Sequence, residues 1–152
     1  MYPTPPIRAA IGFLAAAISV LIFHQGMVGA LHLLAIPGLE VPRAPYSLAP
    51  VPPLGVPVVL DLCFWGGLYG ILFGLVAPRL RGALLLYGLL LGVLAALVGM
   101  FVVAPIKGLP IGGGWVLANW ARSLLINGCW GVGVGLIYPS LADTLGRRRL
   151  PG

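Results

Sequence analysis

The chain has 152 residues, of which 60% are hydrophobic and only 8% are charged. A soluble globular domain carries about 25% charged residues, so this composition excludes an ordinary water-exposed surface. The net charge is +6 at neutral pH. Nucleic-acid binding is not favoured, because the basic residues stand at the edges of apolar runs and form no patch with interleaved aromatic residues. The length suits a single membrane domain.

Four apolar runs are long enough for a helix to cross a bilayer, which needs about 20 residues for a core roughly 30 Å thick. We expect these transmembrane spans at about residues 9–36, 58–77, 83–104 and 115–138. The first run far exceeds the roughly 7–15 apolar residues of a secretory signal, so it is interpreted as a permanent helix. The sequence therefore predicts an all-α, polytopic membrane protein built as a bundle of four helices.

A proline follows each run, and the residue before a proline disfavours the helical conformation. We therefore expect the four helices to end before Pro37, Pro78, Pro105 and Pro139. The longest connection, residues 37–57, is rich in proline and should form an extended exterior loop without helix. We call it the proline-rich segment.

Lysine and arginine indicate the side of the membrane on which each connection lies, because cytoplasmic connections are enriched in them. The sequence predicts both termini and the short connection at 78–82 in the cytoplasm, and the other two connections outside. Trp115 and Tyr138 bracket the last span, as interfacial aromatic residues do. The basic residues on the cytoplasmic side are Arg8, Arg79, Arg81, Arg147, Arg148 and Arg149, and those outside are Arg43 and Lys107.

Glycines recur at four-residue spacing in three spans, which places them on one helix face. In lipid, small residues permit the close backbone contact that holds helices together. The expected packing glycines are Gly66, Gly70 and Gly74, then Gly88 and Gly92, then Gly131 and Gly135. Spans two and four also match at a constant offset, as in a parallel repeat of two hairpins. Spans one and three do not align, and chance remains an equal explanation.

Polar residues within a span are costly in lipid and are candidates for function by default. Here they occupy the outer half and the centre of the bundle, whereas the cytoplasmic half is nearly bare. This asymmetry predicts a polar pocket that opens outward beneath the proline-rich segment. The candidate pocket or ligand residues are His24, Gln25, His32, Asp61, Asn119, Arg122 and Asn127.

Each candidate also has a structural explanation. Arg122 can form a structural pair or extend to the interface, and Asp61 can stabilise the start of its helix through the dipole. A pair between Asp61 and Arg122 depends on how the glycine faces pack, so it stays open. Asparagines within spans often form hydrogen bonds between helices, which would explain Asn119 and Asn127. His24 can be a core histidine whose ring nitrogens are hydrogen-bonded within the protein.

Catalytic and cofactor motifs are not recognisable in this sequence. His24 and His32 share a helix and lie about 12 Å apart along its axis, which does not suit two ligands of one haem. No cluster has the spacing of a zinc site. Three glycines at 112–114 lack the lysine of a phosphate loop and are interpreted as a flexible segment before the last helix. Cys63 and Cys129 are interpreted as small buried residues. We expect that the protein has no enzymatic activity and binds no metal and no cofactor.

Five short segments occur together: HQG at 24–26, PPLGVP at 52–57, FWGG at 64–67, KGLP at 107–110 and NGCWG at 127–131. As a set they resemble a group of small four-helix inner-membrane proteins of alphaproteobacterial type. The resemblance implies a bacterial inner membrane and supplies no activity.

The sequence thus leads to three hypotheses. The first is a non-enzymatic accessory or assembly subunit, which acts through helix–helix and exterior-loop contacts with a membrane protein or a second copy. The second is a small transporter or channel with an outward-facing polar pocket. The third is a protein that binds a lipid or quinone, with Arg122 near its head group.

Overall fold

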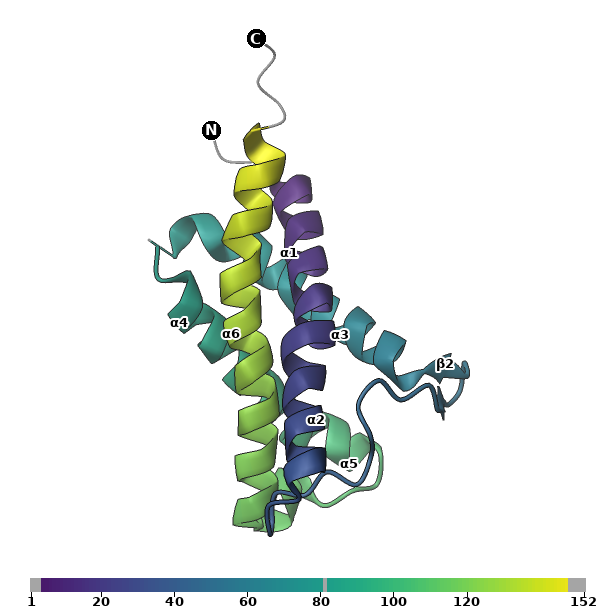
Figure 1. The fold of residues 1–152 in the computed structure, drawn as a ribbon. Coiled ribbons are helices and arrows are strands. Elements are labelled where there is room, and N and C mark those ends of the chain that lie inside the picture. Colours follow the sequence, from purple (N-terminus) through teal and green to yellow (C-terminus); the bar gives the residue numbers. More distant parts are fainter. Residues whose placement is uncertain (1–3, 81, 148–152) are drawn as a thin grey trace.

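The computed structural model describes residues 4–80 and 82–147, and almost all of its regular structure is helical. Four helices are long and apolar enough to cross a membrane, namely Pro5–Leu34, Val58–Arg79, Leu84–Ile106 and Leu117–Leu145. The predicted all-helical fold with four long apolar helices is therefore confirmed. The start of the first helix, the connection between the second and third, and the end of the fourth lie at one end of the molecule (Figure 1).

Two of the long helices contain a π-helical turn. The first consists of α1 (Pro5–Ser19), the π turn Val20–His24 and α2 (Gln25–Leu34). The third consists of α4 (Leu84–Val98), the π turn Gly99–Val103 and α5 (Ala104–Ile106). The second is α3 (Val58–Val76) with a 3-10 extension (Ala77–Arg79), and the fourth is α6 (Leu117–Arg147), preceded by a 3-10 turn (Ile111–Trp115). Strands β1 (Pro50–Val51) and β2 (Val56–Pro57) form a short antiparallel pair.

The expectation that every helix ends before a proline is wrong for two helices. α6 continues through Pro139 to Arg147, and Pro105 lies inside α5, directly after a π turn. A proline ring clashes with the carbonyl four residues earlier in a regular helix. The wider π turn before Pro105 gives the ring room, which explains why the helix can include it.

The first hairpin consists of α1 and α3, which approach each other through glycine. Gly12 faces Gly70 and Gly74, and a Cβ at Gly70 would overlap with the carbonyl oxygen of Gly12. Because the overlapping atoms belong to the backbone, no side-chain rotation could relieve the clash. Gly66, on the same helix, faces side chains instead.

The second hairpin consists of α4 and α6 and is packed in the same way. Gly88 faces Gly131 and Gly135, and a Cβ at Gly131 would overlap with the carbonyl oxygen of Gly88. Gly92 lies against the backbone of Asn127. Close contact through small residues replaces the hydrophobic effect as the source of attraction between apolar helices in lipid.

The contacts of one hairpin repeat those of the other. Gly131 stands 61 residues after Gly70, and Gly88 stands 76 residues after Gly12. The repeat seen in spans two and four therefore extends to spans one and three at the level of packing, although their sequences do not align. Tyr69 and Trp130, which also stand 61 residues apart, pack edge to face with ring centroids 6.1 Å apart.

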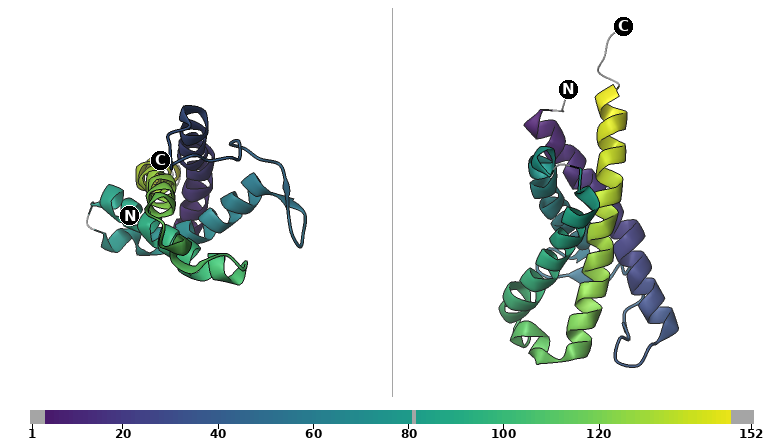
Figure 2. Two further views of the ribbon diagram at one scale, coloured as in Figure 1. Left: turned by 90° about the horizontal axis from the view of Figure 1, so that it is seen from below. Right: turned by 90° about the vertical axis from the view of Figure 1, so that its left-hand side faces the viewer.

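The two hairpins join where α1 crosses α6 (Figure 2). The Ser19 hydroxyl donates to the carbonyl oxygen of Trp130 at 2.6 Å, and the Trp130 indole N–H donates to the carbonyl oxygen of Ala16 at 3.0 Å. Gly133 faces the Ser19 hydroxyl. We call this contact the closed seam. The core of the molecule lies around it and comprises Ile11, Ala15, Ala16, Val20, Phe73, Trp130, Val134 and Tyr138.

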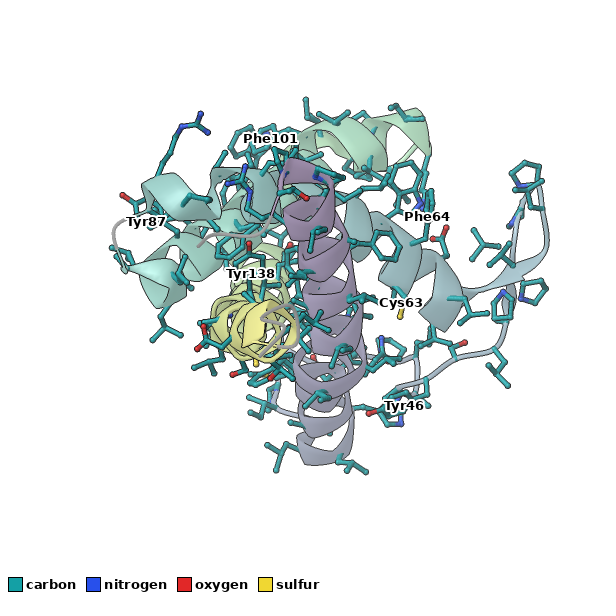
Figure 3. All side chains as sticks on the ribbon, turned by 90° about the horizontal axis from the view of Figure 1, so that it is seen from above. Tyr46, Cys63, Phe64, Tyr87, Phe101 and Tyr138 are labelled. Atoms are coloured by element: carbon teal, nitrogen blue, oxygen red, sulfur yellow. The ribbon has the colours of Figure 1, made fainter. Side chains whose placement is uncertain are left out.

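Tyr138 belongs to this core and packs against protein on nearly all sides, while its expected position at a membrane interface stays a prediction. The residue is 5% exposed, and its hydroxyl donates to the carbonyl oxygen of Gly74 at 3.3 Å. In a regular helix that carbonyl would accept an N–H from Pro78, which proline lacks. Viewed along the long axis, Tyr138 lies centrally, whereas Tyr87 and Phe64 lie on opposite outer sides (Figure 3).

Candidate functional site

The first helix changes from π to α geometry at Gln25. The backbone N–H of Gln25 donates to the carbonyls of Val20 and Ile22, so it skips the carbonyl of Leu21 that a regular α-helix would use. The hydroxyl of Tyr46 donates to that Leu21 carbonyl at 2.8 Å. The π turn therefore leaves a carbonyl that can accept a hydrogen bond from the proline-rich segment. No sequence pattern predicted this π turn.

The side chain of Gln25 binds the same residue of the proline-rich segment. It is 4% exposed, and its Oε1 accepts the backbone N–H of Tyr46 at 2.7 Å. Its Nε2 lies 3.3 Å from Nδ1 of His24. A buried amide needs partners for its oxygen and its nitrogen, and this arrangement supplies both. Tyr46 is thus held through its backbone and its hydroxyl.

Two further candidates bind the backbone of the proline-rich segment. Nδ1 of His32 lies 2.7 Å from the carbonyl oxygen of Val41, so this ring nitrogen carries a proton. Arg122 of α6 donates to the carbonyl oxygen of Glu40 at 2.6 Å, and its second terminal nitrogen donates to Oδ1 of Asn119. The segment is therefore attached to both the first and the fourth long helix.

Asn119 and Trp120 hold the other connection at this end. The side chain of Asn119 donates to the carbonyl oxygen of Gly113 at 2.8 Å, and the indole of Trp120 donates to that of Gly112 at 2.8 Å. The three consecutive glycines have φ values of 58°, 61° and 68°, in the left-handed region that glycine tolerates. The connection adopts a left-handed turn, and its expected flexibility stays a prediction.

Asp61 and Asn127 bond within their own helices. Oδ1 of Asp61 accepts the indole N–H of Trp65 at 3.1 Å, and the amide of Asn127 donates to the carbonyl oxygen of Ser123 at 2.9 Å. The starts of α3 and α6 lie apart in both views (Figures 1 and 2). The pair between Asp61 and Arg122, which the sequence left open, is not formed.

Four of the seven polar candidates therefore anchor the connections at one end of the molecule, namely Gln25, His32, Asn119 and Arg122. Among the residues described, their mutual hydrogen bonds form only two pairs, His24 with Gln25 and Asn119 with Arg122. Within the same residues, no group of three His, Cys, Asp or Glu side chains could hold a metal ion. Cys63 and Cys129 are free and only partly buried. We call the anchored proline-rich segment and glycine turn the outer cap.

A different feature lies toward the opposite end, where α3 and α4 share few contacts. An open apolar groove of about 250 Å³ separates them. Sequence reasoning missed it, because an apolar helix has the same composition whether it faces protein or lipid. The groove is lined by Leu72, Phe73, Val76, Leu80, Tyr87, Leu90, Leu91 and Leu94.

Comparison with protein families, with curated proteins and with solved structures finds no match for this chain. Function must therefore be inferred from the chain's own residues. Three features are available for that inference: the apolar surfaces of the long helices, the outer cap, and the groove between α3 and α4.

Proposed function

We propose that this chain is a multi-pass protein of a bacterial inner membrane. The first long helix has 30 residues and measures roughly 45 Å at 1.5 Å per residue, which exceeds a hydrocarbon core roughly 30 Å thick. Soluble proteins rarely expose large continuous apolar surfaces. Leucines exposed along the four helices include Leu14, Leu60, Leu86, Leu94, Leu125 and Leu136.

The proposed orientation places both termini in the cytoplasm. Support comes from the distribution of basic residues, because cytoplasmic connections are enriched in them. Arg8 lies in the first turn of α1, Arg79 lies between α3 and α4, and Arg147 ends α6, whereas Arg43 and Lys107 lie in the other two connections. Three more arginines that the sequence assigns to the cytoplasmic side, Arg81, Arg148 and Arg149, lie outside the described residues.

Within the membrane, the chain acts by binding, as an accessory or assembly subunit for a membrane protein or a second copy. The observation that carries this proposal is the anchoring of the proline-rich segment by Gln25, His32 and Arg122. A surface that is fixed before binding loses less conformational entropy on association. Leu48 and Leu54 are 73% and 84% exposed on this segment, so it offers apolar contacts to a partner.

The same hydrogen bonds give no support to the alternative of a small transporter or channel. A polar path would need side chains that face a common cavity, whereas these bond to the backbone of the outer cap. The groove between α3 and α4 has an apolar lining. In liposomes we therefore expect the same leak for the wild type and for Arg122→Ala.

Site-specific photo-crosslinking in cells tests the binding role. A photoreactive residue at Leu54 should give one discrete product with a membrane protein or a second copy. The matched control at Leu86, which is 55% exposed on α4, should give only lipid adducts. Arg122→Ala should weaken the Leu54 product because the segment loses an anchor. A monodisperse monomer in mild detergent, without any Leu54 product, would contradict the proposal.

A further inference from the structure

The two hairpins meet in two places, between α1 and α6 and between α3 and α4. Under the packing repeat, the groove between α3 and α4 is the counterpart of the closed seam between α1 and α6. Residues of α3 that line the groove correspond to residues of α6 in the seam that stand 61 positions later in the sequence. Residues of α4 that line the groove correspond to residues of α1 in the seam that stand 76 positions earlier. Leu72, Phe73, Tyr87 and Leu91 of the groove correspond to Gly133, Val134, Ile11 and Ala15 of the seam.

Side-chain size explains why one contact is closed and the other open. Gly133 lets the Ser19 hydroxyl reach the backbone of α6, whereas its counterpart Leu72 carries a bulky side chain that is 57% exposed. Ala15 is fully buried in the seam, and its counterpart Leu91 adds volume between the helices. The open groove is therefore a consequence of the sequence at these positions.

The dimensions of the groove match one acyl chain. Its α3 wall runs from Leu72 to Leu80, roughly 12 Å at 1.5 Å per residue. One leaflet of a bilayer core is about 15 Å deep. The groove has a volume of about 250 Å³ and is open along its length. These dimensions suit a single acyl chain, and a helix from a partner is an outcome that the experiment below distinguishes.

The mouth of the groove at the proposed cytoplasmic end is positively charged. Leu80 lines the groove, and its neighbour Arg79 is exposed. Arg8, in the first turn of α1, lies against Gly74 of α3. Of the three acidic residues in the chain, only Asp143 belongs to this end. This charge attracts an anionic head group and disfavours a cationic one.

We propose that this groove binds one acyl chain of an anionic phospholipid from the cytoplasmic leaflet, with Arg79 against the phosphate group. The inference rests on the proposed membrane insertion and orientation, and it is independent of partner binding at the proline-rich segment. The lipid chain completes between α3 and α4 the contact that protein side chains complete between α1 and α6.

Native mass spectrometry of the full chain, purified in mild detergent with equal amounts of dioleoyl phosphatidylglycerol and dioleoyl phosphatidylcholine, tests the proposal. The wild type should retain one phosphatidylglycerol at least fivefold more often than phosphatidylcholine. Val76→Trp and Leu94→Trp, which fill the groove from its α3 side and its α4 side, should lower retention of both lipids at least fivefold. Leu86→Trp, on α4 outside the groove, should leave retention unchanged.

The head-group part of the proposal has its own variant. Arg79→Gln should bring the preference for phosphatidylglycerol to within twofold of parity, while Lys107→Gln at the opposite end should preserve it. Equal retention of the two lipids by the wild type would overturn the anionic assignment. Unchanged lipid retention in both tryptophan variants would show that the groove is not the lipid site. The same conclusion would follow if the wild type were a dimer and the tryptophan variants dissociated it without losing lipid.

Two controls separate this proposal from the proposed function. Release of the protein by alkaline carbonate would refute membrane insertion, on which both proposals rest. If the protein stays in the membrane and the Leu54 product forms, but no lipid is retained, the groove proposal alone fails. If lipid is retained and no Leu54 product forms, only the subunit role fails.

Discussion

The closed seam between α1 and α6 and the open groove between α3 and α4 occupy corresponding places in two repeated hairpins. Both are lined by apolar residues, yet only the seam excludes space between its helices. In lipid, apolar character alone gives helices no reason to associate. The seam is distinguished by Gly133 at the contact and by two hydrogen bonds, one from the Ser19 hydroxyl to the Trp130 carbonyl and one from the Trp130 indole to the Ala16 carbonyl.

The largest expected effect comes from Gly131→Leu or Gly70→Leu, which would separate the helices within a hairpin. Their added atoms would overlap with backbone of the facing helix, so the loss of stability should exceed the roughly 3 kcal/mol that is usual for overpacking. Both variants should lose the folded monomer on size exclusion in detergent. Gly26→Leu is the matched control, because nothing lies within 4 Å of a Cβ there. Equal behaviour of all three variants would refute the glycine contacts.

The second effect compares the seam with the groove directly. Trp130 is 2% exposed and Leu72 is 57% exposed. Trp130→Ala should lower the free energy of unfolding by about 3–5 kcal/mol, as for other buried large side chains, whereas Leu72→Ala should lower it by less than about 1 kcal/mol. Reversible unfolding in mixed micelles measures both. Similar losses would mean that the groove is as closed as the seam.

The third effect lies outside both contacts, at the outer cap. Arg122→Met removes the charged donor to the Glu40 carbonyl and should cost about 1.5–3 kcal/mol. Trypsin should then cut faster after Arg43, which is exposed on the proline-rich segment. Asn127→Leu removes a bond within one helix and is the control that should leave the cleavage rate unchanged. An unaltered rate in Arg122→Met would show that the segment does not depend on this anchor.

The smallest effect is expected for Ser19→Ala, which removes one hydrogen bond of the closed seam and should cost about 1 kcal/mol. Ala95→Ser, at the position 76 residues later, introduces a hydroxyl at a partly buried site on α4. It should change stability by less than about 0.5 kcal/mol. A larger effect at Ala95 than at Ser19 would reverse the comparison.

The parts of the fold that depend on composition and spacing were predictable. Run length located the four helices, and four-residue spacing located glycines such as Gly70 and Gly131. The roles of the polar residues were not predictable, because Gln25 or Arg122 has the same sequence signature whether it faces a ligand or the backbone of a connection. The rule that a helix ends before a proline did not hold at Pro139, which lies inside α6. The groove was not predictable either, because it depends on side-chain size at positions that correspond under the packing repeat. That repeat was not evident from the sequences of spans one and three.

Disulfide cross-linking tests most directly whether equivalent contacts differ. In a background with Cys63→Ala and Cys129→Ala, one pair of cysteines replaces Ala15 and Val134, which are both fully buried in the core. The other replaces their counterparts Leu91 and Phe73 across the groove. A disulfide needs Cα atoms roughly 4.4–6.8 Å apart. The account predicts rapid oxidation of the first pair and none of the second, and equal oxidation of both would contradict it.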